Sequence, residues 1–139
     1  MVRLVNEHCI PYQAKVPDAK DLIQRYHQIW TPYINFTAAD GVNYHAFYGF
    51  LPPEEFAPQI LLGRAKASLH LGDYGEAGHW YQELVDRYPQ SHAAPEALYW
   101  RGIVAYRESH NADDLLQIWR ELRQRYPDSI WRMKQSFTE

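Results

Sequence analysis

The chain has 139 residues, of which 46% are hydrophobic and 22% are charged, and this composition excludes an intrinsically disordered protein. The net charge of −3 gives no general attraction to nucleic acid or to an anionic membrane, and the apolar runs are shorter than the roughly 18 residues of a membrane span. A single cysteine, Cys9, excludes an internal disulfide, a CxxC pair and a cysteine-rich zinc site. Because no signal peptide is visible, we expect a cytoplasmic protein. From its charge and its short apolar runs, we expect that it binds neither nucleic acid nor membrane.

The residues before position 52 predict the order strand, helix, strand, strand. Apolar and polar side chains alternate in the strand regions, since successive strand residues face opposite sides of a sheet, and apolar residues recur at helical spacing between them. We expect Asp18 to cap the helix and Asp40-Gly41 to form a type I′ turn. The expected elements are a strand over 9–16, a helix over 19–29 and a hairpin with strands over 33–37 and 42–50.

After Leu51-Pro52-Pro53 the apolar period becomes helical, with proline and glycine between the helices. The expected helices cover residues 54–71, 74–87, 93–109 and 112–125, and a short polar helix covers about 129–138. The change of period divides the chain into an α/β segment, residues 1–53, and a helical segment, residues 54–139. The predicted fold class is α+β, mostly α.

The helical segment contains an internal repeat. Residues 81–91 and 119–129 are identical at six of eleven aligned positions, at an offset of 38. Residues 57–61 match residues 94–98 at an offset of 37, so one extra residue is expected in the turn within the second helix pair. The unit is therefore a helix–turn–helix that occurs twice.

This unit resembles the tetratricopeptide repeat. The family's small residue in the first helix matches Ala65 and Gly102, and its small residue in the second helix matches Ala77, where the second repeat has Leu115. Its large aromatic residue matches Tyr81 and Trp119, and its closing proline matches Pro89 and Pro127. The longer period and the Tyr-Pro-x-Ser ending are similar to repeats of bacterial envelope-assembly and Tol-associated proteins. The resemblance implies an α-helical hairpin array whose concave groove binds a protein or peptide.

A short helix after Ser129 is expected to cap this array, because helical arrays usually need about three repeats to be stable. We expect Trp131 and Phe137 to cover the open face of the last repeat.

The order of elements in residues 1–53 is similar to the C-terminal half of a thioredoxin fold. The positions that carry this similarity are Thr31-Pro32 before the hairpin, Asp40-Gly41 at its turn, Gly49 at its end, and residues 2–8 as the tail of the helix that begins at the family's CxxC. The resemblance implies that the Thr31–Pro32 bond is cis. In intact relatives, the backbone before this proline receives extended peptides beside the CxxC.

The CxxC part of that fold would lie before Met1, and so would a strand between residues 9–16 and 33–39. Without that strand, backbone groups facing it would be unpaired. Four alternatives remain open: residues 1–50 form a closed structure of a different kind, pack against the repeats, pair with another chain, or are the remnant of a longer protein. A late start of the reading frame is one hypothesis, which the upstream genomic sequence would decide.

Cys9 and the seven histidines are the candidate reactive residues. We interpret Cys9 as a half-buried strand residue rather than a redox thiol, because its neighbour His8 would point to the opposite face of the strand. The histidines lack HxxxH and HExxH spacing, and nucleotide-binding and acyl-transfer motifs are missing from the sequence. We therefore predict no metal, no cofactor and no enzymatic activity.

The candidate binding residues are aromatic residues of the repeats and the proline position before the hairpin. Two adjacent aromatic residues on a helix cannot both face the core, so one of each pair is expected to line the groove. The expected contacts with a partner are Thr31, Pro32, Trp80, Tyr99 and Trp100.

We interpret the chain as a non-catalytic protein-binding scaffold of the thioredoxin-like tetratricopeptide type. The alternative is a fragment of a thiol–disulfide oxidoreductase, with Cys9 as a thiol and the CxxC upstream or on a partner chain. A third hypothesis is a homodimer that pairs through open strand edges.

Overall fold

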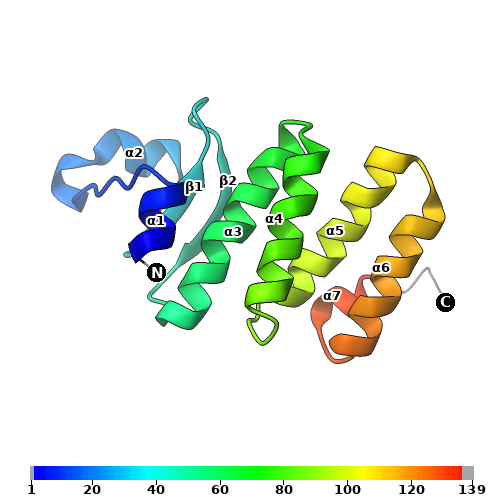
Figure 1. The fold of residues 1–139 in the computed structure, drawn as a ribbon. Helices are drawn as coiled ribbons and strands as arrows, with labels where there is room; N and C mark the ends of the chain where they lie inside the picture. Colours follow the sequence, from blue (N-terminus) through cyan, green and yellow to red (C-terminus); the bar gives the residue numbers. More distant parts are fainter. Residues whose placement is uncertain (1, 136–139) are drawn as a thin grey trace.

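The structure, a computed structural model, describes residues 2–135. Its elements are α1 (Val2–His8), the 3₁₀-helix η1 (Val16–Asp18), α2 (Lys20–Arg25), β1 (Tyr33–Thr37), β2 (Asn43–Tyr48), α3 (Pro53–His70), α4 (Tyr74–Arg87), α5 (Ala94–Ser109), α6 (Ala112–Arg125) and α7 (Ile130–Met133). Figure 1 shows α3 to α6 side by side in one row, with α1 and the hairpin beside α3 at one end and α7 beside α5 and α6 at the other. The described part of the chain is therefore mostly helical, with one small antiparallel sheet.

The four long helices lie where the sequence predicts them. The observed bounds of α4 and α6 equal the predicted ones, and those of α3 and α5 differ by one residue at most. Side chains fix two of the starts: Asp73 Oδ1 accepts a hydrogen bond from the Glu76 N–H (3.1 Å), and Asn111 Oδ1 accepts one from the Asp113 N–H (3.0 Å). Local capping chemistry therefore accounts for these boundaries.

Small residues bring the helices of each pair into close contact. Ala65 on α3 and Ala77 on α4 are fully buried between their helices. In the second pair, a Cβ added to Gly102 of α5 would lie 2.7 Å from the Trp119 ring of α6. Any larger residue would have to displace the indole, which confirms the predicted role of the small residue at this position.

β1 and β2 form the predicted hairpin, but not the predicted turn. Tyr33 pairs with Tyr48, and the register slips by one residue between Phe36 and Thr37. A type I′ turn needs positive φ at both central residues, whereas only Gly41 (φ 74°) has it. The turn is closed instead by the Gly41 N–H, which donates to the Ala38 carbonyl (2.9 Å).

The predicted strand over residues 9–16 is wrong. Residues 9–15 have neither helix nor strand structure, and Ile10 and Tyr12 are 98% and 81% exposed. A strand requires a neighbour for its N–H and C=O groups, and within residues 2–135 the sheet contains only β1 and β2. Alternating apolar residues were not sufficient without a partner strand.

The predicted helix over 19–29 is also shorter in the structure. α2 covers Lys20–Arg25, and Ala19 rather than Asp18 is its N-cap. The helix ends before His27, whose φ of 51° is left-handed. Asp18 instead ends the preceding 3₁₀-helix, where Pro17 favours a short turn.

α1 and the hairpin both pack against α3. α1 covers the residues predicted as a helix tail and buries Leu4 in the main core. A Cβ added to Gly63 of α3 would lie 2.7 Å from the Phe36 ring of β1, so this glycine allows the hairpin to approach the helix. Among residues 2–135, none of the helices combines the length and apolar character of a membrane span.

α7 caps the other end of the row over part of the predicted range. Trp131 packs against Tyr99 and Trp100 of α5, with ring centroids 5.3 and 6.3 Å apart, which confirms the predicted contact with the last repeat. Phe137 lies outside the described residues.

Candidate protein-binding surfaces

One face of α5 carries aromatic and apolar side chains over about two turns. Tyr99, Ile103 and Tyr106 lie three to four residues apart and therefore share this face, which we call the α5 stripe. Tyr106 is exposed, while Tyr99 and Ile103 are half-buried. The stripe begins beside Glu96, so it lies on the side where α5 approaches α3 through the Lys66–Glu96 ion pair (2.6 Å).

Aromatic rings order the start of the stripe. The Tyr99 ring stacks on Trp119 at 5.0 Å, and the Trp119 indole N–H donates to the Tyr99 carbonyl (3.0 Å). Trp131 covers Tyr99 and Trp100 from α7. Both predicted contact residues on α5, Tyr99 and Trp100, are thus half-buried within an aromatic cluster, and the exposed end of the stripe is Tyr106.

Trp80, the third aromatic residue predicted to contact a partner, is buried. The Arg64 guanidinium lies over its indole ring, 4.0 Å from the centroid, and His8 of α1 packs against it edge-on at 5.1 Å. Arg64 also donates to His8 Nδ1 (2.7 Å). Trp80 therefore joins α1 to α3 and α4 and presents little surface to a partner.

A polar network connects the hairpin to the first helices of both pairs. His45 of β2 donates from Nε2 to Gln59 Oε1 (2.6 Å) and accepts at Nδ1 from the Lys66 ammonium (3.2 Å), which also pairs with Glu96 of α5. Burial lowers the pKa of His45, and the neighbouring Lys66 charge lowers it further. His45 is therefore held neutral at the junction of the two segments.

Sequence reasoning missed this network. Gln59, Lys66 and Glu96 lie 14, 21 and 51 residues after His45, and their side chains carry no spacing that distinguishes them from solvated surface residues. Only the packing of the hairpin on α3 brings His45 between Gln59 and Lys66.

Cys9 lies at the end of α1, where its N–H donates to the Val5 carbonyl (2.8 Å). Its side chain is half-buried against the core, and this burial raises the pKa of the thiol. The charge of Arg64 opposes the shift without reversing it. A thiol of this kind is mostly protonated at neutral pH and is a poor nucleophile.

The two residues predicted at the proline position lie at the rim of a large cleft. Thr31 is exposed, Pro32 is half-buried, and the bond between them is cis. Both line a cleft of about 930 Å³ that also contacts residues 10–16, α2 and β1. A smaller apolar cavity of about 440 Å³ lies between α1, the hairpin and the start of α3, and Phe50 lines both.

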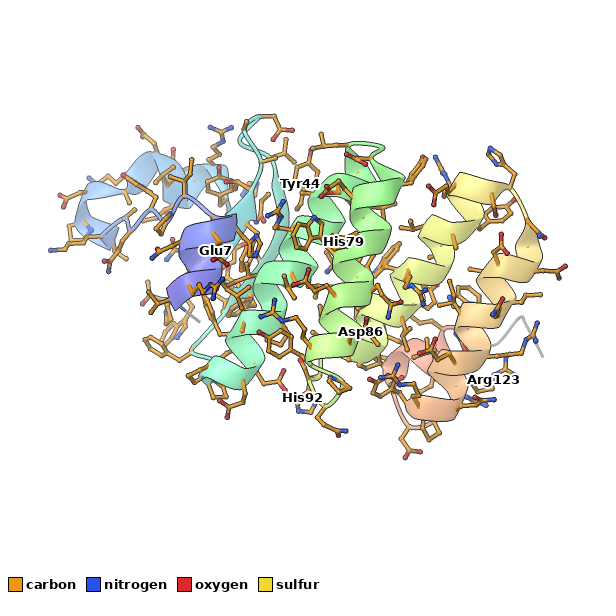
Figure 2. The ribbon with its side chains drawn as sticks, in the orientation of Figure 1. Glu7, Tyr44, His79, Asp86, His92 and Arg123 are labelled. Atoms are coloured by element: carbon orange, nitrogen blue, oxygen red, sulfur yellow. The ribbon has the colours of Figure 1, made fainter. Side chains whose placement is uncertain are left out.

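The second helices α4 and α6 present a charged surface, where Figure 2 labels Asp86 on α4 and Arg123 on α6. Each helix carries an ion pair one turn apart, Glu83–Arg87 and Glu121–Arg125, with the same 2.6 Å distance. Exposed pairs of this kind contribute only about 0.3–0.5 kcal/mol each. This surface is a solvated face and supplies matched control positions for the α5 stripe.

Within residues 2–135, the histidine, cysteine and carboxylate side chains form no group of three that could hold a metal ion. The candidate site consists of two contact surfaces, the α5 stripe and the cleft beside β1.

Comparison with known protein families identifies the helical pairs. The family model described as tetratricopeptide repeat matches residues 59–91 and residues 96–129. These ranges cover most of α3 with α4 and of α5 with α6, so the chain contains two tetratricopeptide repeats at the positions where the internal repeat was found. Neither the curated proteins nor the solved structures gave a significant match, and no similarity supports the thioredoxin-like interpretation of residues 1–53.

Proposed function

We propose that the chain is a non-catalytic protein-binding module. The observation that carries the proposal is the pair of tetratricopeptide repeats, because such repeats generally mediate contacts with protein partners. The proposal places this module in the bacterial cytoplasm.

The α5 stripe is the proposed contact surface of the repeats. The Tyr99 ring is packed between Trp119 and Trp131, and Tyr106 exposes its ring about two turns further along the same face of α5. Ordered aromatic side chains bind at little entropic cost, and interface hot spots are enriched in them. A partner that buries Tyr106 would cover the exposed end of the α5 stripe.

Photocross-linking tests this proposal. p-Benzoylphenylalanine replaces Tyr106 on the α5 stripe or, as a control, Asp86 on the charged face of α4, and the full chain is irradiated in the cells that make it. We expect discrete protein adducts from position 106 and none from position 86. Adducts at both positions or at neither would contradict the proposed surface.

The oxidoreductase alternative has a separate test. Burial raises the pKa of the Cys9 thiol, and that shift opposes redox catalysis by this chain. We expect no reduction of insulin above the background rate. Turnover that is lost in the Cys9→Ser variant would favour the alternative over the binding module.

The homodimer hypothesis is tested by light scattering at high micromolar concentration. A monomeric mass would exclude it, and a dimer would support pairing through the hairpin.

A further inference from the structure

One edge of the hairpin has unpaired backbone groups. The Gly49 N–H donates to the Pro32 carbonyl (2.9 Å), so this pair is hydrogen-bonded, and the pairs alternate along the ladder. Tyr33 is then opposite Tyr48 in a non-hydrogen-bonded pair, in agreement with their stacked rings at 4.3 Å. The N–H and C=O groups of Tyr33 and Asn35 therefore point away from β2, and nothing within residues 2–135 bonds them.

The free edge faces the large cleft. Tyr33, Asn35 and Thr37 of β1 line it, and residues 10–16 line it as a separate segment. α2 contributes Leu22, and its C-cap residue Tyr26 also lines the cleft. At about 930 Å³, the cleft is near the upper end of the roughly 300–1,000 Å³ range of ligand pockets.

Side chains around the cleft expose a large apolar area. Ile10, Tyr12 and Phe50 line it and are 98%, 81% and 91% exposed. An aromatic residue buries about 150–250 Å² when it is covered, so the rings of Tyr12 and Phe50 alone offer on the order of 350 Å². That area is a little under half of the roughly 800 Å² that each partner contributes to a standard interface, which fits a short segment of a partner.

We infer that the cleft binds an extended, uncharged segment of a partner protein, which adds to β1 as a third strand and is covered on its other side by residues 10–16. Main-chain bonds to Tyr33 and Asn35 supply the pairing, and alternate apolar side chains fill the cleft. Lys15 is the one charged residue among the described residues that line the cleft, so a charged segment would lose its hydration without a matching partner.

The hairpin of a second copy of this chain fits the cleft less well than such a segment. The β1 strand of a second copy is already bonded to its own β2 along one edge. A strand between β1 and residues 10–16 needs both edges free, because it has a neighbour on either side. An extended segment that is not part of another sheet meets this condition.

The inference rests on the proposed function as a protein-binding module but concerns a surface other than the α5 stripe. If peptides bind at the cleft but no adduct forms at position 106, only the α5 stripe is rejected as a contact surface. If adducts form at position 106 but no peptide binds at the cleft, only the cleft is rejected.

The test uses peptides selected from a random dodecapeptide library displayed on phage, with the full chain as bait. We expect enriched peptides with apolar residues at every second position and few charges. Their affinities are then measured by fluorescence polarisation against two variants of β1: Asn35→Pro removes the outward N–H, and Asn35→Ala keeps it while also losing the side-chain bond to Asn43. We expect binding to fall by about tenfold or more in the proline variant and to stay within about threefold in the alanine variant.

A second pair of variants guards against misfolding of β1. Ile10→Glu places a charge at the cleft on an almost fully exposed side chain, and Leu71→Glu is its control on an exposed apolar residue outside the cleft. We expect peptide binding to be lost in the first and kept in the second. The inference would be overturned if the library yielded no enriched peptide, or if the peptides bound both Asn35→Pro and Ile10→Glu as they bind the unchanged chain. It would also be overturned if the chain alone formed a dimer and Ile10→Glu dissociated that dimer.

Discussion

The helical array and residues 1–53 differ in how well they cover their own apolar side chains. Of the large apolar residues that are exposed in the described structure, nine lie in residues 2–53 and four in the longer helical part. Each helix of the array has a sequence neighbour against which it packs, whereas a two-stranded hairpin buries little by itself. The array therefore forms its own core, whereas residues 2–53 pack against α3 and leave apolar side chains exposed.

The largest expected effect comes from a matched pair of tryptophan substitutions. Trp119 in the array is 2% exposed, and Trp30 before the hairpin is 72% exposed. We expect Trp119→Ala to lower the free energy of unfolding by about 3–5 kcal/mol, because it leaves a cavity beside Gly102. Trp30→Ala should change it by less than about 0.5 kcal/mol. Chemical denaturation measures both, and similar losses would contradict the difference between the two parts.

A matched pair of glycine substitutions tests the junction between the parts. An added Cβ at Gly63 would meet the Phe36 ring at 2.7 Å, whereas at Gly78 its nearest neighbour would be Val104 at 3.5 Å. We expect Gly63→Ala to destabilise the protein by about 1–3 kcal/mol through overpacking against the hairpin. Gly78→Ala should stabilise it by up to about 1 kcal/mol through helix propensity. Equal effects in thermal unfolding would show that the hairpin does not rest on α3.

Within the array, the two repeats differ at their large aromatic residue. The Tyr81 hydroxyl is buried without a hydrogen-bond partner among the described residues, whereas the matching Trp119 indole donates to a carbonyl. Burial also raises the pKa of Tyr81 strongly. We expect Tyr81→Phe to raise the free energy of unfolding by about 1 kcal/mol, since it removes an unsatisfied polar group. A loss of stability in urea denaturation would mean that the hydroxyl has a partner.

The smallest expected effect is a pH dependence at the junction network. The folded-state pKa of His45 is lowered, so the unfolded chain binds its proton at a higher pH than the folded chain. Stability is therefore kept above the unfolded pKa of about 6.5 and is lost as the pH falls from there through the lowered folded pKa. Lys66 and Glu96 are the charged groups that face His45. His45→Gln should flatten this decrease in denaturation series between pH 7 and pH 5, and an unchanged slope would assign it to other groups.

The array was predictable because its determinants are local and occur twice. The offset between residues 81–91 and 119–129 gave the repeat, and Asp73 and Asn111 supplied the caps that fix α4 and α6. The hairpin strands were also predicted correctly, since their alternation has a partner within a few residues.

The wrong prediction of a strand over residues 9–16 has a long-range cause. Residues 9–16 have the alternation of a strand, but strand formation depends on a neighbour that no local pattern supplies. The position of Trp80 under Arg64 and the network around His45 likewise depend on which segments pack together. Long-range packing therefore decided the candidate site, while local chemistry decided the array.

Amide hydrogen exchange of the free chain, measured residue by residue by NMR, tests the open strand edge most directly. The account predicts alternation along β1: slow exchange at Ile34 and Phe36, whose N–H groups bond to β2, and fast exchange at Tyr33 and Asn35, whose N–H groups face the cleft. Equal protection at all four amides would show that the edge is already paired and would contradict the account.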